Sequence, residues 1–336
     1  MTGKERLRAA LEHTVLGHAV LQTRRNLRDE RASRKLDGYT YEFVDRSRGC
    51  EKLCIVLAGY KQALWEDVFG RIAAFVPDDV DMCIMTSGLV SEELRSIAEA
   101  HGWSYLSTSV NHLSLVQNIA IECHPQAKWI YKLDEDMFVT RGFFENLFNT
   151  YGRVQNDSVY EPAFVAPLIN VNCYGHIRLL QKLSLYDDFK RTGISEAIVS
   201  DGLKRNKSAI EDPRVALYMW GDSQEQLCDI DALSVSFASE PFEYSVCPVR
   251  FSIGAILFNR DLWSEMGGFP ITFIGSDYGI GDDEEFLCRY AFDSARAIIV
   301  SENCLVGHLG YGGAQTQRMM SYHAEHPERF ALPEGC

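Results

Sequence analysis

Residues 129–139 read WIYKLDEDMFV, an apolar run that ends in three consecutive acids and then turns apolar again. Such a run is typical of a buried strand, and strand ends are where an α/β sheet presents its ligand-binding groups. In an extended backbone Asp134 and Asp136 point to one side, and Glu135 points to the other and is expected to be structural. Two carboxylates on one side can share a divalent cation, because hard cations take oxygen ligands. The stretch therefore favours a cation that carries a phosphorylated ligand, with a solvated strand end as the alternative.

The composition is that of a globular protein. The 336 residues are 46% hydrophobic and 24% charged, which is enough apolar surface for a sizeable core. The net charge of -14 argues against nucleic acid as a partner, because nucleic-acid binding needs a basic surface. The 10 cysteines include no Cys-x-x-Cys pair and no zinc ligand pattern. No secretory signal or membrane-spanning run is recognised, so a cytoplasmic protein is expected, either free or at the inner face of a membrane.

The first 50 residues are predicted to form a helical extension. Residues 3–35 repeat apolar side chains at spacings of three and four, as an amphipathic helix does. Basic residues outnumber acidic ones in this segment, which suits contact with anionic lipid headgroups. The pattern is equally compatible with docking on the body, with dimerisation, and with a solvated helix face.

From residue 52 onward, short apolar strands alternate with helices. Strands are predicted at 53–58, 80–85, 103–106, 129–133, 164–169 and 251–258, and helices at 62–75, 91–100, 111–123, 142–151 and 260–266. Alternation of this kind predicts an α/β protein whose parallel strands are joined by right-handed crossovers. Residues 172–247 are the least regular part of the chain.

Three further stretches carry groups suited to ligand chemistry. Residues 277–289 read DYGIGDDEEFLCR, in which four acids follow a glycine-rich turn. Capping a helix needs fewer than four acidic residues, so one of these acids is a candidate general base. Residues 306–313 read VGHLGYGG, which places His308, a candidate metal ligand, in a predicted glycine-rich loop. Residues 58–61 read AGYK, where Tyr60 is suited to stacking on a base. The alternatives for the three stretches, in the same order, are a structural helix cap, a structural histidine and an ordinary turn. Neither a P-loop nor a dinucleotide fingerprint is present at residues 58–61.

These stretches occur in the order found in glycosyltransferases with the GT-A fold, and residues 52–315 resemble that family. Asp-x-Asp after an apolar strand is its signature. Residues 251–260, 267–269 and 281–283 read FSIGAILFNR, GGF and GDD, and look like the acceptor side of inverting family 2-like bacterial enzymes. In those enzymes a Gly-Glu-Asp motif is followed, six residues after its Asp, by an Arg. Asp283 and Arg289 match this Asp and Arg, while Asp282 replaces the Glu.

The resemblance implies a GT-A architecture. Residues 51–170 are then a Rossmann-like half that binds the nucleotide sugar, and residues 171–336 are the acceptor-binding half of the same domain, with a mixed central sheet. The implied ligands of Mn²⁺ or Mg²⁺ are Asp136 and His308, with Asp134 at the metal or the ribose. The implied catalytic residues are Asp283, as general base, and Asp282. The implied nucleotide site comprises Ala58, Gly59, Tyr60, Lys132 and Asp134.

The implied reaction is transfer of a sugar, with inversion, from a nucleotide sugar to a hydroxyl of an oligosaccharide or lipid-linked glycan. The expected cytosolic character and the basic first segment suit a bacterial enzyme of surface polysaccharide synthesis. A UDP-sugar is the first expectation, although residues 86–88 read TSG where many family 2 enzymes place an Asp that reads uracil. The alternatives are a retaining GT-A enzyme, a sugar-1-phosphate nucleotidyltransferase, a nuclease and a scaffold without activity. Trp220 is expected to stack on a sugar ring in the acceptor pocket.

Overall fold

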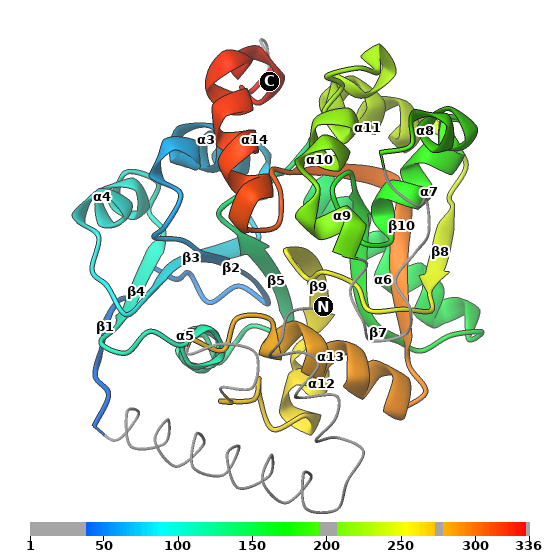
Figure 1. The fold of residues 1–336 in the computed structure, drawn as a ribbon. Coiled ribbons are helices and arrows are strands. Elements are labelled where there is room, and N and C mark those ends of the chain that lie inside the picture. Colours follow the sequence, from blue (N-terminus) through cyan, green and yellow to red (C-terminus); the bar gives the residue numbers. More distant parts are fainter. Residues whose placement is uncertain (1–37, 195–206, 273–277, 334–336) are drawn as a thin grey trace, which may run out of the picture.

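The computed structural model describes residues 38–194, 207–272 and 278–333. The helix predicted at residues 3–35 lies outside the described residues. Within them the chain forms a ten-stranded sheet with helices packed against it (Figure 1). None of the helices in these ranges is both long and apolar enough to cross a bilayer.

The strands of the sheet come from both halves of the sequence. Their order is β1 (Tyr41–Val44), β4 (Ser104–Thr108), β3 (Val80–Ser87), β2 (Lys52–Leu57), β5 (Trp129–Asp134), β9 (Ala255–Asn259), β7 (Pro162–Ile169), β10 (Ala297–His308) and β6 (Met137–Phe138), with β8 (Tyr244–Cys247) also paired to β10. Strands β4, β3, β2 and β5 are parallel, whereas β9 is antiparallel to both of its neighbours. The predicted α/β class with a mixed central sheet is therefore confirmed.

The helices that follow the parallel strands lie close to their predicted positions. They are α3 (Trp65–Phe75), preceded by the 3-10 turn η1 (Gln62–Leu64), then α4 (Glu92–Ala100), α5 (Leu113–Glu122) and α6 (Phe143–Asp157). In this part of the sheet β2 and β3 are buried on both faces, as parallel strands covered by helices are.

The part of the chain that looked irregular in the sequence is mostly short helices. They are α7 (Gly175–Lys182), α8 (Tyr186–Thr192), α9 (Lys207–Glu211), α10 (Pro213–Met219), η2 (Glu225–Leu227) and α11 (Ile230–Ser239). The remaining helices are α12 (Arg260–Glu265), α13 (Asp282–Asp293), α14 (Gly313–Glu325) and η3 (Pro327–Arg329). Figure 1 shows α14 beside α10 and α3, so the end of the described chain returns to the edge of the sheet where β10 ends.

The prediction that His308 lies in a glycine-rich loop is wrong, because His308 is the last residue of β10. This strand is buried along its whole length, although polar residues interrupt its apolar pattern. Glu302 forms an ion pair with Arg178 at 2.6 Å, and the amide of Asn303 donates to the carbonyl of Phe237 at 2.8 Å. Buried polar groups are tolerated when they are hydrogen-bonded in this way.

The prediction that Trp220 is a sugar-stacking platform is also wrong, because its side chain is fully buried. Its ring packs on Phe330, with centroids 4.3 Å apart, and meets Phe138 edge-on at 5.5 Å. The indole N–H donates to the carbonyl oxygen of His308 at 2.8 Å. Trp220 therefore supports the end of β10 from within the core.

We expect Trp220→Ala to lower the free energy of unfolding by about 3–5 kcal/mol, because it removes a large buried ring and leaves a cavity. Denaturant unfolding followed by circular dichroism measures the change. The matched control is Phe242→Ala, which removes a side chain that is 36% exposed and should cost no more than about 1 kcal/mol. A Trp220→Ala protein as stable as this control would contradict the core assignment.

Candidate active site

A pocket of about 730 Å³ lies at the carboxyl ends of β2, β5 and β10. Its lining includes six of the residues singled out in the sequence: Tyr60, Lys132, Asp134, Asp136, Asp283 and His308. Ala58, Gly59 and Asp282 are buried or half-buried nearby and are not part of the lining. The fold thus gathers most of the predicted site at one edge of the sheet, where α/β proteins bind their ligands.

Glu135 faces the turn that follows β2, and its expected structural role is confirmed. Its carboxylate accepts hydrogen bonds from the backbone N–H of Gly59 at 2.9 Å, from that of Tyr60 at 3.0 Å and from the indole of Trp65 at 2.7 Å. Gly59 has a φ of +141°, a backbone conformation that residues other than glycine rarely adopt. Glu135 therefore holds the first strand-to-helix turn in place through charge-assisted hydrogen bonds.

Asp134 is paired with Lys132 two residues earlier on the same face of β5. The Lys132 ammonium is buried and donates to Asp134 Oδ1 at 2.8 Å and to the carbonyl of Ile253 at 3.0 Å. Burial disfavours this charge, but Asp134 and Asp283 hold the pKa of Lys132 above its usual value. Burial also raises the pKa of Asp134, which Lys132 opposes and the nearby Asp136 reinforces. The carboxyl group of Asp134 is thus partly neutralised by Lys132 and still lines the pocket.

Asp136 is buried, and the neighbouring Lys61 ammonium favours its ionised form. Its Oδ2 atom accepts from the Lys61 ammonium and lies 3.4 Å from His308 Nε2. Burial alone would raise the pKa of Asp136, but the Lys61 ammonium, joined by His308 when that ring carries a second proton, holds it well below its usual range. The sequence predicted no role for Lys61, which follows Tyr60. Its positive charge next to a predicted ligand-binding turn was the feature that could have indicated a role in the site.

The two nitrogens of His308 have different partners. Nδ1 lies 2.6 Å from the carbonyl oxygen of Val171 and therefore carries a proton, since a carbonyl can only accept. In the neutral ring Nε2 then directs a lone pair toward Asp136. Metal-ligating histidines are oriented in the same manner by a carbonyl on their other nitrogen.

Asp136 and His308 are therefore suited to hold a divalent cation between them. Among the described residues no three His, Cys, Asp or Glu side chains are grouped to hold a metal ion. A cation at this pair would complete its coordination with phosphate oxygens and water, as Mg²⁺ commonly does. The residues present fit a cation that arrives with a phosphorylated ligand.

Asp283 lies in the first turn of α13 and is buried at the pocket wall. Its Oδ2 atom accepts from the side-chain amide of Gln117 at 3.0 Å, and Oδ1 accepts from the backbone N–H of Glu284 at 2.8 Å. Asp282 instead accepts from the hydroxyl of Thr272 at 3.0 Å. Of these two acids, Asp283 is the one placed and oriented at the pocket.

Arg250 anchors the start of α13, a contact that sequence reasoning missed. Its guanidinium pairs with Glu284, lies 3.2 Å from Glu285, and donates to the carbonyl of Gly281 at 3.0 Å. Arg289, which the family resemblance singled out, is 52% exposed and pairs with Glu285 at 2.9 Å. The buried arginine that faces this helix turn is thus Arg250.

Tyr60 presents an anchored ring at the pocket. Its hydroxyl donates to the carbonyl of Ser87 at 2.9 Å and accepts from the amide of Asn111 at 2.8 Å, while the residue as a whole is 60% exposed. Ser87 and Asn111 also line the pocket and were missed in the sequence. An aromatic ring fixed by its hydroxyl suits stacking on a flat ligand group.

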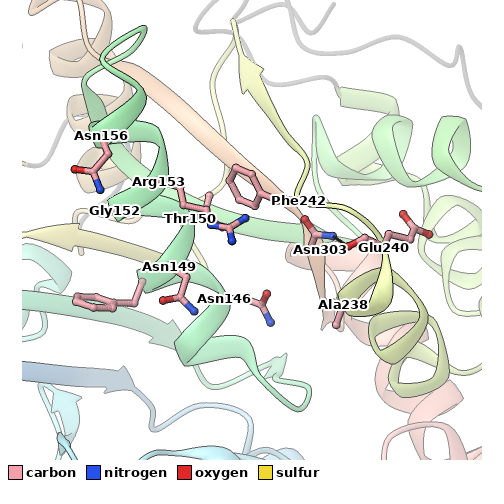
Figure 2. Close-up of a pocket in the computed structure, with 11 residues that line it drawn as sticks. Asn146, Asn149, Thr150, Gly152, Arg153, Asn156, Ala238, Glu240, Phe242 and Asn303 are labelled. Carbon is pink, nitrogen blue, oxygen red and sulfur yellow. Dashed lines mark hydrogen bonds between the residues drawn. The ribbon is translucent and has the colours of Figure 1, made fainter.

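A second pocket, of about 610 Å³, lies between α6 and residues 238–242 (Figure 2). Figure 2 shows the side-chain amides of Asn146, Asn149 and Asn156 along α6, with Arg153 beside Phe242. Arg153 stacks over the Phe242 ring at 4.6 Å, and the Asn303 amide is engaged by backbone carbonyls. This pocket contains none of the predicted site residues, so the chemistry is assigned to the pocket at the carboxyl edge.

We expect Glu135→Gln to lower the free energy of unfolding by about 1–3 kcal/mol, because an amide nitrogen would face a buried donor in place of an accepting oxygen. Chemical denaturation provides the measurement. Glu99→Gln, on the exposed face of α4, is the matched control and should change stability by no more than about 0.5 kcal/mol. Equal stability of the two variants would show that Glu135 does not hold the turn.

Comparisons with known proteins assign neither a family nor an activity. No family model matches the sequence, and no curated protein matches it. One similar solved structure is the mannosyltransferase PcManGT from Pyrobaculum calidifontis with GDP-Man and Mn²⁺, at 15% identity over 97% of this chain and 74% of that chain, with a TM-score of 0.44. Another is GalNAc-T7 with UDP, GalNAc and Mn²⁺, at 12% identity over 86% of this chain and 53% of that chain, with a TM-score of 0.44. This chain thus spans about half of the GalNAc-T7 chain.

Proposed function

We propose that this protein is a metal-dependent glycosyltransferase of the GT-A type that moves a sugar from a nucleotide sugar to a glycan hydroxyl. The observation that supports this most is the meeting, in one pocket, of a cation-binding pair and a separate oriented carboxylate. The pair is Asp136 with His308, and the carboxylate is Asp283. A donor phosphate site and a general base are the two parts that such a transfer needs.

The donor is bound at the end of β5. Asp136 and His308 would hold the cation, which when bound would supply positive charge to the diphosphate leaving group. Asp134, kept in place by Lys132, offers an acceptor to a ribose hydroxyl. The exposed, anchored ring of Tyr60 stacks on the base. We favour a UDP-sugar as the first donor to test.

The acceptor reacts beside α13. Its hydroxyl oxygen forms a bond to the anomeric carbon as the bond from that carbon to the diphosphate oxygen breaks. The proton passes to Asp283, and the electron pair leaves with the nucleoside diphosphate. Gln117 and the Glu284 backbone hold the Asp283 carboxylate in one orientation throughout. A single displacement of this kind inverts the anomeric configuration.

Inversion is favoured over retention because a retaining enzyme needs no general base. Asp283 lines the pocket, and the Gln117 amide orients its carboxylate there, which is the placement that a general base requires. The acceptor we propose is a glycan of a surface polysaccharide, free or linked to lipid. A basic segment at residues 1–50 would suit a lipid-linked acceptor at a membrane surface.

We expect Asp283→Asn to lower kcat by about 100- to 10,000-fold, because the amide cannot take the acceptor proton. Donor binding should remain within about threefold of wild type, since the change is isosteric. Turnover assays with candidate nucleotide sugars and calorimetric titration with UDP and GDP separate the two effects. Asp293→Asn, at the exposed far end of the same helix, is the control. Near-normal turnover of Asp283→Asn would exclude Asp283 as the base.

We expect Asp136→Asn to weaken Mn²⁺-dependent nucleotide binding at least about tenfold, because the metal loses its anionic ligand. Removal of metal with EDTA should have the same effect on the wild-type protein. Isothermal titration with UDP and GDP, with and without Mn²⁺, tests both. The matched control is Asp67→Asn, which alters another Asp–His pair, 2.7 Å from His323 and outside the pocket. Unchanged Mn²⁺ dependence in Asp136→Asn would refute the metal assignment.

A further inference from the structure

We propose that Lys61 and the divalent cation exchange at Asp136, and that the displaced Lys61 ammonium then pairs with the diphosphate of the donor. This inference rests on the proposed function and adds a residue and a binding order to it. It concerns Lys61, which neither the Asp-x-Asp pattern nor the acceptor-side motifs include.

The first step is that the ammonium and the cation compete for the same oxygen. Asp136 Oδ2 accepts from the Lys61 ammonium and is also the atom that faces His308 Nε2 at 3.4 Å. A cation held by Asp136 and His308 would therefore have to bind at the oxygen atom to which the Lys61 ammonium donates. Two positive groups a few ångströms apart in a buried site repel strongly, so they do not share this oxygen.

The second step is that Lys61, and not Lys132, is free to move. The Lys132 side chain is 2% exposed and is held by both Asp134 and the Ile253 carbonyl. The Lys61 side chain is 26% exposed, and Asp136 is the hydrogen-bond partner of its ammonium within the described residues. Lys61 also lines the pocket, so a rotation of its flexible stem keeps the charge inside.

The third step is the charge that a donor meets on entry. The pocket lining includes Asp134, Asp136 and Asp283, and its two lysines are Lys61 and Lys132. A cation at Asp136 and His308 would supply part of the positive charge that an anionic diphosphate needs beside this wall, and a lysine ammonium would add to it. Because Lys132 is committed to Asp134, the ammonium released from Asp136 is the one that can meet the phosphates, as a point charge of the kind lysine provides.

Exchange makes metal and donor binding cooperative. Without a donor, the cation must displace Lys61 from a buried ion pair, which lowers its apparent affinity by the fraction of molecules in which Asp136 is free. With a diphosphate present, the displaced ammonium gains a new partner, so each ligand increases the affinity for the other. Lys61 thereby disfavours binding of the metal by itself.

The test is Lys61→Met in the full chain, with Mn²⁺ alone as the first probe. Electron paramagnetic resonance or calorimetric titration should show Mn²⁺ binding about tenfold tighter than in wild type, because the competing ammonium is gone. Lys61→Arg keeps the charge and should retain the weak wild-type affinity. Lys128→Met, which removes a lysine from the exposed pair with Glu51, makes the same change in net charge and should leave Mn²⁺ affinity unaltered.

The second probe is UDP, and GDP in parallel, at saturating Mn²⁺. Here Lys61→Met should bind the nucleoside diphosphate several-fold more weakly than wild type. Opposite shifts for the metal and the diphosphate are the signature of exchange, since a merely misfolded variant would lose both. Unfolding curves of all variants check that each one is folded.

The proposed exchange would be overturned if Lys61→Met bound Mn²⁺ with an affinity within twofold of wild type. It would also be overturned if neither protein bound Mn²⁺. Tighter Mn²⁺ binding without weaker diphosphate binding would overturn the second half of the proposal. Failure of the proposed function has a different appearance: the wild-type protein would then transfer no sugar from any donor, whatever the shifts in Mn²⁺ affinity among the variants.

Discussion

The end of β5 carries three consecutive carboxylates, of which Asp134 is half-buried and the next two are buried, and the site depends on how each of them is accommodated. Unpaired charges in a protein interior are prohibitively costly, so each needs its own partner. Lys132 neutralises the first acid from within the strand. Backbone N–H groups and an indole solvate Glu135 from the turn after β2. Lys61 and His308 surround the third acid. The turn after β2 and the end of β10 must therefore both meet β5 at this edge.

The sheet topology makes that meeting possible. Strand β6 follows the acidic turn directly and pairs antiparallel with the end of β10, so that His308 lies opposite Met137. The next residue, Leu309, donates from its backbone N–H to the carbonyl of Asp136 at 3.1 Å. On the other side, Trp220 fixes the carbonyl of His308 from the core. The separation between Asp136 and His308 is thus set mainly by backbone pairing and core packing, which suits a site that must be formed before its ligand arrives.

Much of the parallel part of the sheet was predictable from local sequence, because its strands are apolar runs buried on both faces and bounded by clear breaks. Lys52–Leu57 and Trp129–Asp134 illustrate this. Strand β10 was not predicted. Its sequence is interrupted by polar residues 301–303, which are satisfied by Arg178 and by the Phe237 carbonyl, both remote in the chain. These polar residues interrupt the apolar pattern by which a buried strand is recognised. For this reason His308 was predicted to lie in a loop.

The acids of the site were likewise easier to find than the groups that control them. Acidic clusters are visible locally, but the partner of Arg250 lies 34 residues away and that of Lys61 lies 75 away. These partners decide which acid is available for chemistry.

Glu284 and Glu285 are engaged by Arg250, and Asp282 is hydrogen-bonded to the Thr272 hydroxyl. Asp283 faces the pocket with a neutral amide as its side-chain partner. An acid engaged by a guanidinium is committed to that ion pair. Placement at the pocket and the choice of hydrogen-bond partners, more than the order of acids in the motif, therefore single out Asp283 as the candidate base.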